Sequence, residues 1–69
     1  MSELSITIGQ LIRKERQKNK ISQEHLALRC GIDRSYMGRI ERGEVNLTVE
    51  KLFEIAQVLK ISPKDLLPD

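Results

Sequence analysis

Apolar residues recur along the chain at spacings of three and four, which is the period of an α-helix with one buried side. Thr7 is a candidate cap for a first helix that runs to about Lys18, after a frayed tail at residues 1 to 5. The side chains of this helix that we expect to face inward are Ile8, Leu11 and Ile12. The beginning of the chain therefore predicts one amphipathic helix.

Residues 22 to 42 predict two short helices joined by a tight turn. Ser22 is placed to cap the first of these helices, Gly31 stands where a left-handed residue would end it, and Asp33 is placed to cap the second. Because only about three residues separate the two helices, they are expected to meet at a sharp angle.

Beyond Gly43, a loop leads to Thr48, a candidate cap for a fourth helix that ends near Leu59 or Lys60. The apolar stripe of this helix is made of Val49, Leu52, Phe53, Ile55, Ala56 and Leu59. A stripe of this width predicts a helix that packs on the core.

Residues 62 to 65 carry the start signal of a short fifth helix, a serine cap followed by a proline at the first helical position. Leu66 and Leu67 would lie on this helix, and Pro68 would end it. Because no segment has the alternating β-branched or aromatic pattern of a strand, none is predicted. We therefore expect an all-α, compact five-helix bundle, folded as one domain over residues 1 to 69.

Positive charge is concentrated in one part of the chain. The formal net charge is only +2, from 12 Lys and Arg against 10 Asp and Glu. Residues 13 to 42 nonetheless hold nine basic residues against four acids, whereas residues 43 to 69 hold three against five. This asymmetry predicts a basic surface that faces a polyanion such as nucleic acid.

The helix that begins at Arg34 has two chemically different sides when it is projected at about 100° per residue. Its polar arc contains Arg34, Ser35, Gly38, Arg39 and Arg42, and the opposite arc contains Tyr36, Met37 and Ile40. Arginine can pair with O6 and N7 of guanine and serine with several base edges, so this arc is typical of a helix that reads DNA. The alternative is that the three arginines only solvate an exposed helix face.

Several short motifs resemble the Cro/phage-repressor helix-turn-helix family of the XRE type, over about residues 7 to 67. The matching motifs are Ser22-Gln23, Leu26-Ala27, Gly31-Ile32, Ile40-Glu41-Arg42-Gly43 and Asn46-Leu47-Thr48. The last two, together with Asp33-Arg34-Ser35-Tyr36, are most similar to the controller proteins of restriction-modification systems. The resemblance implies a lambda-repressor-like bundle that binds double-stranded DNA.

We expect the residues that contact DNA to divide into base readers and phosphate contacts. Arg34 and Ser35 are the primary candidates for reading bases, followed by Arg39. The candidates for contacting phosphates are Gln23, Tyr36, Arg42, Asn46 and Thr48, and the resemblance implies this role for Gln23, Asn46 and Thr48. Thr48 could equally serve only as a helix cap.

Glu41 falls between the polar and apolar arcs, where an acid needs a partner. The resemblance implies a partly buried salt bridge with Arg16, whose planar fork can meet both carboxylate oxygens. We interpret the pair as structural, because it would tie the first helix to the recognition helix.

A second copy of the chain is an expected partner, because one recognition helix reads only about half a turn of duplex. The C-terminal third has more apolar side chains than one thin core face requires. The candidate dimer contacts are Phe53, Val58, Ile61, Leu66 and Leu67. The alternative is that these side chains only close the core of a very small domain.

Cys30 and His25 are the only residues of their kinds, so neither an internal disulfide nor a four-ligand zinc site is expected. We interpret Cys30 as filling a small buried slot and His25 as a solvent-facing polar residue. The chain has no Gly-rich phosphate loop and no H-E-x-x-H motif, which predicts no catalytic residue, no cofactor and no enzyme activity. It also lacks an apolar run of about 18 residues and a secretory signal, which predicts a cytoplasmic protein without membrane or small-molecule partners.

These features together predict a sequence-specific regulator of transcription that binds a palindromic operator as a homodimer. The controller-like pattern implies autoregulation and activation of a linked restriction gene, with RNA polymerase as a further partner. No residues follow the fifth helix that could sense a ligand, so the switch is expected to be the protein's own concentration. The alternatives are a phage or plasmid repressor and an antitoxin-like module that binds a protein.

Overall fold

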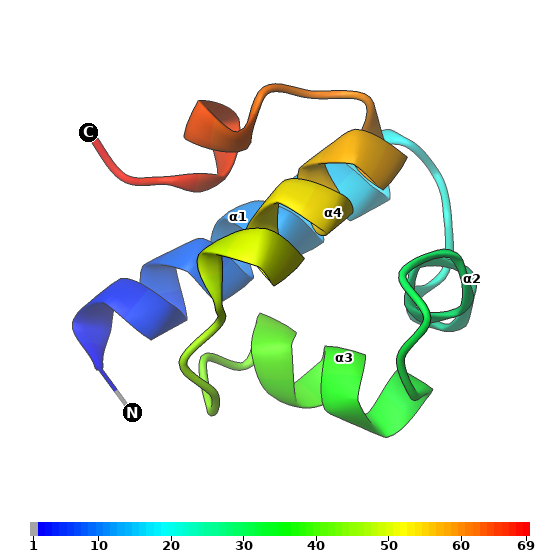
Figure 1. Cartoon of the computed structure of the whole chain (residues 1–69), viewed down its shortest axis with the longest axis horizontal. Coiled ribbons are helices and arrows are strands. Elements are labelled where there is room, and N and C mark those ends of the chain that lie inside the picture. Colours follow the sequence, from blue (N-terminus) through cyan, green and yellow to red (C-terminus); the bar gives the residue numbers. More distant parts are fainter. Residues whose placement is uncertain (1) are drawn as a thin grey trace.

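Four α-helices and one short 3-10 helix make up the computed structural model, which describes residues 2–69 (Figure 1). The α-helices are α1 (Glu3–Lys18), α2 (Gln23–Arg29), α3 (Arg34–Glu41) and α4 (Val49–Leu59), and the 3-10 helix is η1 (Pro63–Leu66). Residues 2–69 contain no strand, so the all-α prediction is confirmed. No helix in this part of the chain is long and apolar enough to cross a membrane.

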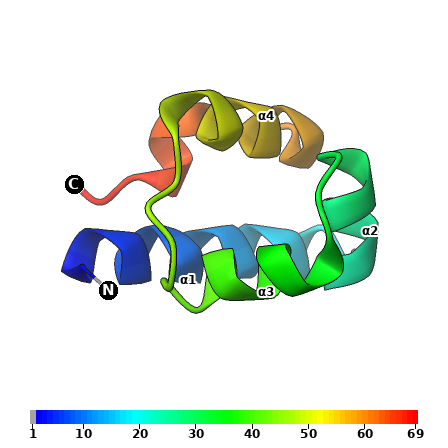
Figure 2. The same ribbon diagram turned by 60° about the horizontal axis from the view of Figure 1, so that its bottom comes forward.

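The helices enclose a single core. α4 lies along one side of the molecule and α3 along the opposite side, with α2 at one end (Figure 2). The largest fully buried side chains are Ile12, Leu26, Met37, Ile55, Leu59 and Leu66, so every helix contributes to the core. α3 buries Met37, Gly38, Ile40 and Glu41, and it leaves Arg34, Ser35 and Arg39 exposed on the surface.

α1 begins earlier than the sequence predicts. Ser2 is its N-cap, and the Ser2 hydroxyl accepts a hydrogen bond from the Ser5 backbone N–H at 3.0 Å. The prediction of a frayed tail at residues 1 to 5 was therefore wrong for residues 2 to 5, while Met1 lies outside the described residues. Thr7 is not a cap either, because its hydroxyl donates to the Glu3 carbonyl at 3.0 Å from inside the helix.

The fifth element is a single 3-10 turn and not an α-helix, which corrects the predicted five-helix count. The Ser62 backbone N–H donates to the Asp65 carboxylate at 3.2 Å, so the predicted start signal does operate. Leu67 is already extended, with φ −116° and ψ 147°. Proline disfavours helical backbone in the residue that precedes it, so Pro68 ends the element after one turn.

α1 and α3 approach each other most closely at Gly9. A Cβ atom placed on Gly9 would overlap the Ile40 carbonyl oxygen and would lie 2.6 Å from the Glu41 carbonyl oxygen. Only a residue without a side chain allows this approach. The contact sets how far the C-terminal end of α3 stands from α1.

Candidate nucleic-acid interface

The turn between α2 and α3 has two of the three features that the sequence predicts, the Ser22 cap and the left-handed Gly31, but not the Asp33 cap. The Ser22 hydroxyl accepts from the His25 backbone N–H at 3.0 Å, and Gly31 follows α2 with φ +68° in the left-handed region. Asp33 stands at the N-cap position of α3, but its side chain makes no capping hydrogen bond. The turn aims α3 away from α2 at a sharp angle (Figure 1).

Side chains from α2 and α3 form one shallow, polar hollow on the surface. It is lined by Gln23, Arg34, Ser35, Gly38 and Arg42. We call this set, together with the neighbouring Arg39, the basic surface. The structure thus brings the predicted base readers Arg34 and Ser35 next to Gln23 and Arg42, two of the predicted phosphate contacts.

Gly38 gives two of these side chains a place to lie. A Cβ atom on Gly38 would be 3.1 Å from Arg42 Nη1 and 3.5 Å from Gln23 Oε1. Gly38 is therefore buried beneath these two side chains, and the α3 backbone is not exposed at this position. A side chain at this position would require the end of the Arg42 side chain to shift.

Beneath the basic surface, Glu41 is bonded to two other helices. Arg16 Nε donates to Glu41 Oε2 at 2.7 Å and Arg16 Nη2 donates to Oε1 at 3.2 Å. Gln23 Nε2 donates to the same Oε1 at 3.1 Å. The remaining Arg16 Nη1 donates to the Ile21 carbonyl at 3.0 Å. This buried carboxylate therefore joins α1, α2 and α3 beneath the basic surface.

The Gln23 side chain can bond to Glu41 and still offer a second N–H donor at the surface. Its amide nitrogen carries two N–H donors, and the bond to Glu41 uses one of them. The second donor remains for a phosphate, beside the free backbone N–H groups at the start of α2. The buried bond orients the side chain, which a sequence motif alone does not reveal.

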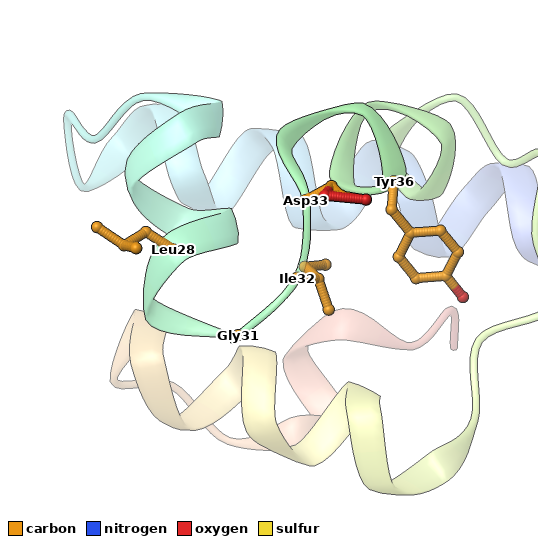
Figure 3. Close-up of a pocket in the computed structure, with 5 residues that line it drawn as sticks. All are labelled: Leu28, Gly31, Ile32, Asp33 and Tyr36. Carbon is orange, nitrogen blue, oxygen red and sulfur yellow. The ribbon is translucent and has the colours of Figure 1, made fainter.

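Tyr36 lies apart from the basic surface, on the other flank of α3. It lines a second hollow together with Leu28, Gly31, Ile32 and Asp33 (Figure 3). The ring is half-buried against the core, and Leu28 points away from it on α2. A phosphate contact by Tyr36 would thus lie on a different side of α3 from the one made by Arg42.

Asn46 and Thr48 lie on the loop between α3 and α4. The Asn46 side-chain oxygen accepts from the Ser5 hydroxyl at 3.0 Å, which ties the loop to the start of α1. The Thr48 hydroxyl accepts from the Lys51 backbone N–H at 3.1 Å, so Thr48 is the cap of α4. Neither bond decides whether these residues also contact DNA, and those two roles remain predictions.

Glu44 lies beside the basic surface, and the sequence analysis did not predict it. Its carboxylate accepts a hydrogen bond from Arg42 Nε at 2.6 Å and lies 3.8 Å from Arg39 Nε. The hydrogen bond from Arg42 lowers the pKa of the Glu44 carboxyl, and it raises the pKa of the Arg42 guanidinium. The available signal was the placement of an acid two residues after Arg42 and five after Arg39.

The candidate dimer contacts divide into exposed and buried groups. Phe53 is 56% exposed and Leu67 41% exposed, whereas Val58 and Ile61 pack half-buried against the core. Leu66 is completely buried in this chain, so it is a core residue, which corrects its assignment as a dimer contact. Val49, 70% exposed and one turn before Phe53, was assigned only to the helix stripe.

Cys30 lies where the sequence predicts, in a small buried slot at the end of α2. Burial raises the pKa of its thiol, and the nearby Lys51 ammonium partly offsets that effect. A thiol of this kind is a poor nucleophile near neutral pH.

The sequence of the chain is similar to the sequences of several known proteins. The helix-turn-helix family matches residues 12–66 of the chain. Control protein C.BamHI of Bacillus amyloliquefaciens is 37% identical over 67 residues, which are 96% of this chain and 83% of that protein. Control protein C.SmaI of Serratia marcescens is 38% identical over 60 residues, which are 87% of this chain and 71% of that protein.

A solved structure agrees with these relatives. The crystal structure of the restriction-modification controller protein C.AhdI from Aeromonas hydrophila matches with a TM-score of 0.86 at 39% identity, covering 90% of each chain. The resemblance drawn from the sequence motifs is confirmed by these matches. The chain therefore belongs to the helix-turn-helix family and, within it, to the restriction-modification controller proteins.

Proposed function

We propose that this chain regulates transcription by binding a palindromic operator as a homodimer, with α3 of each copy in the major groove. The observation that supports this most directly is the basic surface, on which Arg34, Ser35 and Arg39 stand exposed along one side of α3. Exposed arginine and serine side chains on one side of a helix supply the hydrogen-bond groups that base edges in the major groove can pair with.

Arg34 and Ser35 are the base readers in this proposal. They occupy the first turn of α3, which is the part of a recognition helix that reaches deepest into the groove. The Arg34 fork suits the O6 and N7 acceptors of guanine, and the Ser35 hydroxyl can bond to several base edges. Arg39, which lies one turn further along α3, reads a neighbouring base pair.

Phosphate contacts hold α3 in its register. Gln23 and Arg42 on one flank and Tyr36 on the other contact the two walls of the groove, and Asn46 and Thr48 extend the contacts along the loop before α4. These contacts supply most of the affinity, because each neutralised phosphate releases condensed counterions.

The homodimer forms through α4 and the segment after η1. Val49 and Phe53 lie one turn apart on α4, and both are exposed, as is Leu67. Exposed apolar side chains such as these are candidates for a contact surface on a small protein. A two-fold axis through it would place the two α3 helices about 34 Å apart, on successive turns of one face of the duplex.

The regulated gene is a restriction endonuclease gene linked to the chain's own gene. Three relatives are named as control proteins, from Bacillus amyloliquefaciens, Serratia marcescens and a Mycoplasma species. A dimer that both occupies its own promoter and contacts RNA polymerase would couple its own concentration to the timing of restriction.

The experiment is a gel-shift titration of salt. The chain is mixed with duplexes selected from a random pool and, in parallel, with unselected duplex, from about 50 to 200 mM salt. We expect binding to both at the low end, with a steep loss as salt rises and a selected sequence that is palindromic. If unselected duplex is not bound even at about 50 mM salt, an antitoxin-like protein-binding module is the better explanation.

A further inference from the structure

Glu44 places a negative charge among the arginines of the basic surface. Its carboxylate accepts from Arg42 Nε at 2.6 Å and lies 3.8 Å from Arg39 Nε. The Glu44 backbone N–H also donates to the Arg39 carbonyl at 2.9 Å, which anchors the residue on the end of α3. Arg39 and Arg42 are thus paired with one acid before any DNA is present.

The atoms used in these pairs leave the outer ends of both arginines free. Each contact is made by Nε, at the base of the guanidinium group. The two terminal nitrogens are the pair that an end-on contact with guanine or with a phosphate requires. Arg42 Nη1 also lies beside Gly38, 3.1 Å from the position that a Cβ atom of that residue would take.

We propose that Glu44 is a specificity-determining residue, which positions Arg39 and Arg42 for an operator and withholds their charge from random duplex. This inference rests on the proposed function, since it concerns how the same surface distinguishes one DNA sequence from another. Glu44 acts through the two arginines and is therefore a positioning residue.

The two binding modes depend differently on this acid. Affinity for random duplex comes almost entirely from neutralised phosphates, so a carboxylate that competes for Arg39 and Arg42 weakens that mode. At an operator, Arg39 can contact a base through its terminal nitrogens while its Nε stays beside Glu44. Operator binding therefore loses less affinity than binding to random duplex does. Glu44 thus raises the ratio of operator affinity to random-duplex affinity.

The test is Glu44→Gln, which removes the charge and keeps the size of the side chain. The operator probe is the tightest duplex selected from a random pool by the wild-type chain, and a scrambled duplex of equal length is the second probe. Fluorescence anisotropy over a salt series gives the dissociation constant of each. We expect scrambled-duplex affinity to rise roughly threefold to tenfold at about 0.1 M salt, with operator affinity changed by less than about twofold.

Two further variants separate net charge from positioning. Glu54→Gln removes the same charge from an ion pair with Lys51 within α4, outside the basic surface, and we expect it to leave the affinity ratio unchanged. Glu44→Asp keeps the charge but shortens the side chain, and we expect it to weaken operator binding severalfold while scrambled-duplex affinity stays near wild type.

Three results would overturn the inference. The first is an equal rise in affinity for both probes in Glu44→Gln. The second is a change of the operator-to-scrambled affinity ratio in Glu54→Gln as large as that in Glu44→Gln. The third is wild-type operator affinity in Glu44→Asp. The proposed function fails separately, if the wild-type chain binds no duplex and selects no sequence. If the wild-type chain selects an operator but Glu44→Gln leaves the ratio of operator to scrambled-duplex affinity unchanged, only the role of Glu44 is refuted.

Discussion

At the scale of single residues, the basic surface depends on polar side chains that are fixed by other polar side chains. Glu41 is 7% exposed, and its carboxylate is satisfied by Arg16 on one side and Gln23 on the other. A buried carboxylate with three charge-assisted or amide hydrogen bonds keeps its partners in one rotamer. The orientation of Gln23 on the basic surface thus depends on a bond made below the surface.

Glu41→Gln should destabilise the fold. It removes the charge that balances the nearly buried Arg16 guanidinium, so we expect a loss of about 3 kcal/mol and a fall in Tm of more than about 10 °C for a domain this small. Thermal unfolding followed by circular dichroism measures the change. Glu54→Gln is the control and should lower Tm by far less, because the Glu54 side chain is 52% exposed. An unchanged Tm in Glu41→Gln would contradict a structural role.

Arg34→Ala and Gln23→Ala should have different effects on binding. Arg34→Ala removes a base contact, so discrimination at one operator position should fall by about 1–3 kcal/mol. Gln23→Ala should weaken all sequences by a similar factor, because a phosphate contact carries no sequence information. Binding of each variant to a set of single-base operator variants measures both effects. Even losses across all operators in both variants would show that the two roles are wrongly assigned.

At the scale of the elements, the positions of α1 and α3 depend on glycines for two distinct reasons. Gly9 is required because the backbone of α3 fills the space where a side chain would go. Gly31 is required because its φ of +68° is strained for other residues, although nothing lies within 4 Å of its missing Cβ. The first acts through packing between helices and the second through the backbone of one turn.

Gly9→Ala should therefore cost more stability than Gly31→Ala. The added methyl group must push α1 and α3 apart, at a cost of about 2–3 kcal/mol, and no side-chain rotation can relieve it. Gly31→Ala should cost only about 1–2 kcal/mol, from the left-handed backbone. Chemical denaturation of both variants gives the two free energies of unfolding. If Gly31→Ala costs more stability than Gly9→Ala, then α1 and α3 can move apart with little loss of stability.

At the scale of the whole molecule, two surfaces with different chemistry lie on opposite sides of the core. The basic surface follows α3, and the apolar group of Val49, Phe53 and Leu67 lies on α4 and after η1 (Figure 2). With this separation, the proposed contacts with DNA and with a second copy would not block each other.

Phe53→Asp should abolish the dimer and leave the monomer folded, because Phe53 is exposed in the single chain. Buried aromatic anchors of an interface commonly carry about 2–4 kcal/mol, so the dimer dissociation constant should rise at least about thirtyfold. Sedimentation equilibrium measures it. Leu28→Asp makes a similar change at a 77% exposed leucine on α2 and should leave dimerisation unaffected. Equal loss in both variants would place the interface elsewhere.

Local signals in the sequence determined the helix-turn-helix pair and most of the basic surface. Ser22, Gly31 and Thr48 act on their own neighbouring backbone, so their effects can be read without a fold. The arc that carries Arg34, Ser35 and Arg39 follows from helical periodicity alone. The family motifs lie on these same segments, and they identified the controller proteins for that reason.

Only the tertiary structure decided which side chains are buried and which charges meet. Leu66 and Leu67 are adjacent in the sequence, yet one is in the core and the other is exposed, because the single turn of η1 directs them differently. The bond from Gln23 to Glu41 joins residues 18 positions apart, and no local pattern predicts it. The spacing of Glu44 from Arg39 and Arg42 was a local signal, but the pairing itself forms because the chain turns back at the end of α3.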